Sequence, residues 1–131
     1  MKPFPFLSLH RALVLLRIAT AVMFLAHAVV RICNGSIPQF SGYLADKGFP
    51  FSTPIVWLIT AFEIIGGASL CLGYFVRWLS FGFIVLLLSG IIIIHYSAGW
   101  FVGEHGSGGM EYSVTLIFAL ITIAATDRPH R

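Results

Sequence analysis

WLSFGFIVLLLSGIIIIHY, from Trp78 to Tyr96, contains no acidic or basic side chain apart from His95. A continuous apolar run of this kind can cross a bilayer as a helix, which takes roughly 17 to 25 residues. A strand is disfavoured because the apolar residues do not alternate with polar ones, and because backbone groups in lipid must bond within their own segment. The stretch therefore predicts a transmembrane helix.

Three further apolar runs are of similar length, at about residues 12–32, 54–75 and 110–126, so that 78–96 is the third of four. The composition agrees, since 58% of the 131 residues are hydrophobic and only 10% are charged. No linker or shift in composition divides the chain. We therefore predict an all-α integral membrane protein, a four-helix bundle in which residues 1–131 form a single transmembrane domain in contact with the lipid bilayer.

The basic residues are distributed unevenly about these helices. Six lie on the side of the termini and two on the opposite side: Lys2, Arg11, Arg17, Arg77, Arg128 and Arg131 against Arg31 and Lys47. Because basic residues favour the cytoplasmic side, both termini are predicted to be cytoplasmic in the inner (plasma) membrane. The segment 95–113 and a long loop from Cys33 to Thr53 are then outside. The net charge of +3 reflects this asymmetry and does not indicate a nucleic-acid partner.

The first apolar run also has a second interpretation, as a cleaved signal peptide. A basic start and an apolar run precede Ala26-His27-Ala28, which fits a small-residue cleavage pattern. However, Arg17 interrupts the apolar core, and the run continues beyond this point to Ile32. A transmembrane helix is therefore the preferred interpretation.

Ionisable side chains within the predicted helices are the candidate functional residues, because each costs roughly 2.5 to 3.5 kcal/mol at the centre of a span. At about 100° per residue, the first helix carries a polar stripe that we expect to face inward: Arg17, Thr20, Phe24, His27 and Arg31. On the second helix, one side combines a carboxyl group with small residues: Thr60, Glu63, Gly66, Gly67 and Gly73. Small residues allow close helix approach, so Glu63 is predicted to face another helix.

From the helical rise, His27 lies about 7 Å and Glu63 about 13 Å below the outer helix ends, with His95 and Glu111 near the outer boundary. We therefore expect one polar site in the outer leaflet of the membrane. Within it, we expect a group of the first helix to hold Glu63, and His27 is the nearest candidate. Other interpretations stay open. Arg31 can act as a membrane-end anchor, the His27 and Glu63 side chains can form a purely structural bond, and His95 and Glu111 can be favourable helix-terminal charges. Glu104 and His105, in the glycine-rich loop, are expected to be solvated.

The chain resembles the DoxX family of small four-helix membrane proteins over about residues 11–126. The resemblance rests on RIATAVMFLAHAVVRI, FSGYLADKGFP, EIIGGASLCLGYFVR, and HYSAGWF followed by GGMEY. The family often has glycine and then lysine after the first histidine, whereas here Ala28 follows His27 and Arg31 takes the basic place. Some relatives resemble subunits of a quinol oxidase or of a thiosulfate:quinone oxidoreductase, and others are associated with oxidative-stress proteins. The resemblance implies redox association more than any particular reaction.

The leading functional hypothesis is a redox-associated membrane subunit, linked to quinone, within an oxidoreductase whose partner protein supplies the electrons. Quinone chemistry needs hydrogen-bond donors and protonatable groups, and five side chains offer them: His27, Arg31, Glu63, His95 and Glu111. A b-type haem between His27 and His95 is less favoured because their depths differ by about 5 Å or more. Apart from this haem, no metal site is expected, and no residue is assigned a catalytic role. The non-redox alternative is a small-molecule or ion-binding, transport or assembly subunit, which would need a homo-oligomer to form a pathway.

Overall fold

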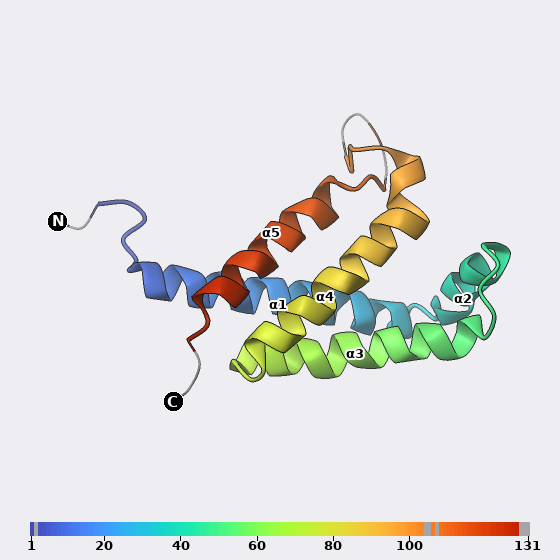
Figure 1. The fold of residues 1–131 in the computed structure, drawn as a ribbon, viewed down its shortest axis with the longest axis horizontal. Helices are drawn as coiled ribbons and strands as arrows, with labels where there is room; N and C mark the ends of the chain where they lie inside the picture. The colour runs from blue at the N-terminus through green and yellow to red at the C-terminus, as the bar shows by residue number, and fades with distance from the viewer. Residues whose placement is uncertain (2, 104–105, 107, 129–131) are drawn as a thin grey trace. The chain divides into compact units, whose positions relative to one another are not determined.

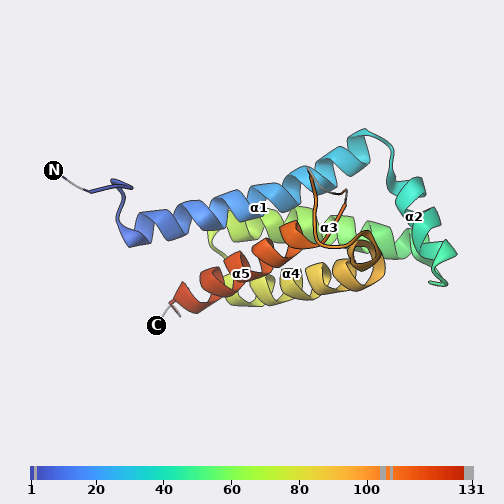
Figure 2. The ribbon, with the colours of Figure 1, turned by 90° about the horizontal axis from the view of Figure 1, so that it is seen from above.

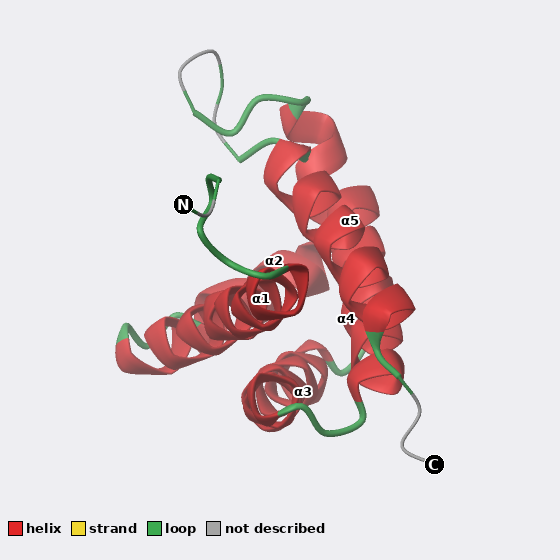
Figure 3. Ribbon diagram, turned by 90° about the vertical axis from the view of Figure 1, so that its left-hand side faces the viewer, coloured by secondary structure: helices red, strands yellow, loops and turns green. Residues whose placement is uncertain are grey.

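The structure is a computed structural model that describes residues 1, 3–103, 106 and 108–128. Helices and loops account for these residues, with no strand among them (Figures 1 and 3). This described part of the chain contains five α-helices, which are, in chain order, α1 (Leu9–Cys33), α2 (Ile37–Asp46), α3 (Ser52–Leu72), α4 (Val76–Gly90) and α5 (Glu111–Thr126). A π-helical turn, η1 (Ile91–His95), and a 3-10 turn, η2 (Tyr96–Ala98), continue α4. The predicted all-α class is confirmed.

Among the residues that the structure describes, three helical segments are long and apolar enough to cross a membrane. They are α1, α3 and the continuous segment Val76–Ala98 that α4 forms with η1 and η2. These segments correspond to the predicted helices at 12–32, 54–75 and 78–96. The predicted fourth helix exists as α5, but its 16 residues make it a shorter apolar helix.

The α2 helix shows that the prediction of a loop from Cys33 to Thr53 was wrong. Ile37, Ser41 and Leu44 are buried, and their spacing of four and three residues places them on one face of α2, which contacts α3. Pro38 lies in the first turn, where its missing N–H costs no helical hydrogen bond. The prediction failed because a ten-residue amphipathic helix contains no apolar run of spanning length.

The end of α3 also differs from its predicted position at Phe75. Gly73 adopts a left-handed backbone conformation, with φ of 89°, directly after Leu72. The Tyr74 N–H then donates to the Ser69 carbonyl oxygen at 2.9 Å, which satisfies a carbonyl group of the last helical turn. Glycine tolerates this left-handed conformation, and the conformation ends α3 three residues before the apolar run ends.

The helices belong to two compact units. The α1–α3 unit, Ala21–Tyr74, contains the second half of α1 together with α2 and α3. On α1 its buried residues are Ala21, Phe24 and Ala28. On α3 they are Val56, Thr60, Glu63, Gly66, Gly67 and Leu70, so four of the five residues predicted to share the Glu63 side are buried. The fifth, Gly73, lies just beyond the end of α3 and is half-buried.

A close approach between α1 and α3 occurs at Gly67. A Cβ atom at this position would lie 2.9 Å from Leu25 Cγ and 3.4 Å from the carbonyl oxygen of Ala21. The first of these distances is shorter than ordinary van der Waals contact. Glycine at position 67 therefore sets how closely the two helices pack.

The α4–α5 unit contains Met1–Thr20 and Phe75–Arg131. Within it, α4 and α5 lie side by side and contact each other (Figures 1 and 2). The buried side chains are Val76, Ser80 and Phe83 of α4 and Ser113, Leu116, Leu120 and Ile123 of α5. Their spacing of three or four residues gives each helix one buried face, as expected for paired helices.

Candidate functional site

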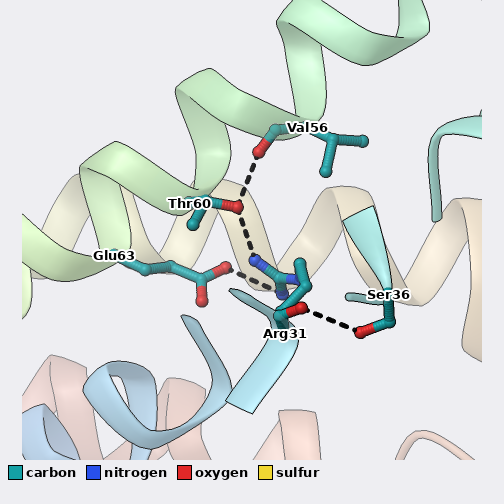
Figure 4. Close-up of polar contacts among 5 residues, drawn as sticks. All are labelled: Arg31, Ser36, Val56, Thr60 and Glu63. Carbon is teal, nitrogen blue, oxygen red and sulfur yellow. Dashed lines mark hydrogen bonds and ion pairs between the residues drawn. The ribbon is translucent and has the colours of Figure 1, made fainter. Parts of the chain in front are cut away.

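Arg31 and Glu63 form an ion pair between α1 and α3 (Figure 4). The Nη2 atom of Arg31 lies 3.4 Å from Glu63 Oε1, and the two side chains are 17% and 6% exposed. The prediction that a group of the first helix holds Glu63 is therefore confirmed. The partner is Arg31, however, in place of His27.

Thr60 provides a second contact for the same guanidinium group. Arg31 Nη1 donates to Thr60 Oγ1 at 3.0 Å, and the Thr60 hydroxyl donates to the Val56 carbonyl oxygen at 2.8 Å (Figure 4). Because Thr60 and Glu63 are three residues apart, one turn of α3 presents both oxygen atoms to Arg31. The sequence placed Thr60 on the Glu63 side of the helix but did not identify it as a site residue; that spacing was the available signal.

The end of α1 and the start of α2 hold Arg31 in place. The Ser36 backbone N–H and hydroxyl both donate to the Arg31 carbonyl oxygen, at 3.0 and 3.2 Å, and so satisfy a carbonyl group of the last helical turn (Figure 4). From α2, the Phe40 ring lies with its centroid 5.2 Å from Arg31 Cζ, within the range of a cation–π contact. We call Arg31, Phe40, Thr60 and Glu63 the Arg31 cluster.

The two carboxylate oxygens of Glu63 have different surroundings. Oε1 accepts from Arg31, whereas Oε2 is buried and has no hydrogen-bond partner among the described residues. The residue as a whole is 4% exposed. A buried polar group without a partner costs about 1 to 3 kcal/mol, and a ligand that donates an N–H or O–H group would recover part of this. The unpaired Oε2 is therefore the feature that makes the cluster a candidate ligand site.

His27 does not take the inward position predicted for it. The side chain of His27 is exposed, while that of the neighbouring Ala28 is completely buried. The face of α1 that packs in the α1–α3 unit follows Ala21, Phe24 and Ala28 and then reaches Arg31, at spacings of three, four and three residues. His27 lies about 100° from Ala28 around the helix and one turn before Arg31, so it is at the edge of that face.

His95 and Glu111 belong to the α4–α5 unit, where both contact the connection between these helices. His95 Nδ1 lies 2.6 Å from the Gly108 carbonyl oxygen, and the Val102 N–H donates to Glu111 Oε1 at 3.2 Å. The Glu111 backbone N–H also donates to the Trp100 carbonyl oxygen at 3.0 Å. These contacts give both side chains a structural role in the connection, and their role in ligand binding stays a prediction.

Other predictions concerning the site are untested. Glu104 and His105, expected to be solvated, lie outside the described residues. In the described part of the chain, no three or more His, Cys, Asp or Glu side chains are grouped to hold a metal ion. A haem between His27 and His95 stays a prediction, as does a single site that unites the Arg31 cluster with Glu111.

Comparison with known proteins adds one finding. A profile of the DoxX family matches residues 12–96. No curated protein and no solved structure gave a match. The matched segment contains the whole Arg31 cluster and His95 and ends before Glu111. It covers well over half of the chain and agrees with the three apolar helices long enough to cross a membrane. The protein therefore belongs to the DoxX family of membrane proteins.

Proposed function

We propose that this protein is a redox-associated membrane subunit that binds a quinone headgroup at the Arg31 cluster, while a partner protein supplies the electrons. The observation that carries the proposal is the Arg31–Glu63 ion pair, held between two helices that are long and apolar enough to cross a membrane. Charged side chains within spanning helices are costly, and they commonly mark functional sites. Arg31 of this pair also contacts Thr60 and Phe40, so the two charges belong to a cluster of interacting side chains.

The chemistry of the cluster suits such a headgroup. A guanidinium group has five N–H donors, and Arg31 uses two of them on Thr60 and Glu63. Glu63 adds a protonatable group, and the Phe40 ring adds an apolar surface. For His27, His95 and Glu111, a role in binding the headgroup stays a prediction from the sequence. Because the sequence contains neither C-x-x-C nor C-x-x-C-H, the electrons are assigned to a partner protein.

The proposal includes a membrane topology with four spans, both termini cytoplasmic and location in the inner membrane. Arg77, at the start of α4, donates from Nη2 to the Asp127 carbonyl oxygen at 2.7 Å, directly after the end of α5. This bond supports an antiparallel hairpin in which α5 returns across the membrane. At about 1.5 Å per residue, α5 is about 24 Å long, and a slightly short span is accommodated by local thinning of the bilayer.

Analysis of co-purifying lipids tests the proposed function. The wild-type protein, an Arg31→Met/Glu63→Leu double variant and an Asp46→Asn variant would be solubilised gently, and their extracts analysed by mass spectrometry. The double variant removes both charges together, because replacing a whole buried pair is tolerated better than leaving one charge alone. Asp46 is an exposed carboxyl group at the end of α2, outside the cluster, and serves as the control.

Quinone enriched with the wild-type and Asp46→Asn proteins, but at background level with the double variant, supports the proposal. A melting curve in the same detergent checks that the double variant is folded. Equal quinone in all three samples would remove the Arg31 cluster from the site. Phospholipid alone in every sample would favour the non-redox alternative, a small-molecule, ion-binding, transport or assembly subunit.

A further inference from the structure

The Arg31 cluster has one buried polar atom that its own residues leave without a hydrogen bond. Among the described residues, Glu63 Oε2 has no partner, although Oε1 of the same carboxylate accepts from Arg31. The Glu63 residue is 4% exposed, so bulk solvent has little access to this oxygen. A ligand that satisfied Oε2 would therefore gain an interaction that the protein alone does not make.

The other polar atoms of the cluster are in a different situation. The Thr60 hydroxyl both donates, to Val56, and accepts, from Arg31. Within the described chain, neither Arg31 nor Thr60 has a side-chain nitrogen or oxygen that is buried without a partner. What the cluster lacks is therefore a donor for an acceptor atom, because the contact with Arg31 favours the ionised form of Glu63, and an ionised carboxylate only accepts.

This asymmetry distinguishes the two redox forms of a quinone. The oxidised headgroup has two carbonyl oxygens and no donor, so placing it at Oε2 would bring two acceptors together. The reduced headgroup, a hydroquinone, has two O–H groups, and an O–H donating to a carboxylate makes a short, strong hydrogen bond. Resting on the quinone function proposed above, we propose that the Arg31 cluster selects the hydroquinone, whose O–H group donates to Glu63 Oε2. This is a binding preference and involves no electron transfer.

A single substitution is expected to reverse the preference. In a Glu63→Gln variant, the carboxamide oxygen takes the position facing Arg31, because Arg31 can only donate. The carboxamide NH₂ group then takes the place of Oε2 and offers a donor where the wild-type protein offers an acceptor. The variant should therefore bind the oxidised headgroup better than the reduced one.

The test uses a short-tailed benzoquinone, oxidised or chemically reduced under anaerobic conditions. It is titrated calorimetrically into the full-length protein in lipid nanodiscs, with empty nanodiscs as the blank. For the wild-type protein and the Asp46→Asn control we expect the reduced form to bind about tenfold to hundredfold more tightly, as for one hydrogen bond to a charged group. For Glu63→Gln we expect the opposite order.

The outcomes separate this inference from the proposed function. If the oxidised form binds the wild-type protein as tightly as the reduced form, or more tightly, the inference is overturned while the quinone site stands. If neither form binds above the empty nanodiscs, the proposed function fails, and the inference fails with it. If Glu63→Gln does not fold, as judged by its melting curve, the comparison of the two forms on the wild-type protein decides alone.

Discussion

The Arg31–Glu63 pair is a one-point contact, since a single nitrogen of Arg31 lies 3.4 Å from a single oxygen of Glu63. Its partners Thr60 and Phe40 add a hydrogen bond and a ring contact to the same guanidinium group. In a poorly hydrated environment, removing one member of such a pair leaves the other charge without compensation. The pair therefore couples α1 and α3 energetically, whatever the cluster binds.

A double-mutant cycle on this pair is the first prediction. Arg31→Met alone and Glu63→Leu alone should each lower the free energy of unfolding by about 3 to 5 kcal/mol, as for other broken buried pairs. The double variant should lose less than the sum of the two, because it leaves no unpaired charge. Equilibrium unfolding in mixed detergent micelles measures all four proteins, and strictly additive losses would contradict the coupling.

Whether a residue of the site could be predicted from the sequence depended on how the helices pack against each other. Glu63 could be identified from sequence because it is a carboxyl group among small residues in an apolar run. Its partner could not, since His27 and Arg31 fall within the same predicted arc of the first helix. The choice between them is made by the burial of Ala21, Phe24 and Ala28, which lie on the Arg31 side. Helical periodicity gives no such ranking before the neighbouring helix is known.

The packing of α1 against α3 gives a second prediction, at the level of these helices. Gly67→Ala would place a Cβ 2.9 Å from Leu25 Cγ, so the variant should lose about 1 to 3 kcal/mol of stability through overpacking. Gly42→Ala in α2 is the matched control, because no atom lies within 4 Å of the added Cβ. Helix propensity should make Gly42→Ala neutral or more stable by about 0.5 to 1 kcal/mol.

A background substitution tests the stated cause. On a Leu25→Ala background the clashing Cγ atom is gone, so adding Gly67→Ala should then have a small effect. Melting temperatures in one detergent compare the four proteins. An equal loss from Gly67→Ala on both backgrounds would show that Leu25 is not the obstacle.

The connection between α4 and α5 gives a third prediction. Glu111→Ala removes the acceptor of the Val102 N–H, so exchange of this amide with solvent should accelerate. Glu111→Gln keeps an acceptor oxygen at the same reach and should preserve most of the protection. Hydrogen–deuterium exchange of the protein in nanodiscs measures both. Equal exchange in the two variants would mean that the hydrogen bond to Glu111 does not hold the connection.

Elements of the fold differed in how well the sequence predicted them. The long apolar helices were predicted because their runs have spanning length, and their ends shifted by only a few residues. The α2 helix was not predicted, although Ile37, Ser41 and Leu44 have helical spacing and Pro38 suits a first turn. The α2 helix is stabilised by its contact with α3. A prediction made from each segment of the sequence separately does not include such a contact.

For the molecule as a whole, the two cysteines test the proposed topology. Cys33 ends α1 and Cys71 lies one residue before the end of α3, so the proposed spans place them on opposite sides of the membrane. In right-side-out vesicles, a membrane-impermeant maleimide should label Cys33 in a Cys71→Ser variant. It should label Cys71 in a Cys33→Ser variant only after permeabilisation.

A reporter fused after Arg131 completes this prediction. Four spans return the C-terminus to the cytoplasmic side, where a fluorescent reporter is active and a periplasmic phosphatase reporter is not. A chain with three spans and a peripheral α5 would give the reverse activities. Labelling of Cys71 from outside would instead overturn the assignment of α1 and α3.

The π-helical turn Ile91–His95 has a consequence for how this sequence can change over generations. A π turn accommodates one residue more than an α-helical turn, so it resembles an insertion held inside a continuous helix. Exchanging one isoleucine of Ile91–Ile94 for valine or leucine leaves the residue count intact. Deleting one would restore α-helical winding, and because the π turn takes up the extra residue, His95 would keep nearly the same direction toward the Gly108 carbonyl oxygen. We therefore expect this segment to accept both substitutions and the loss of one residue, whereas deleting a residue from the regular part of α4 would rotate everything that follows by about 100°.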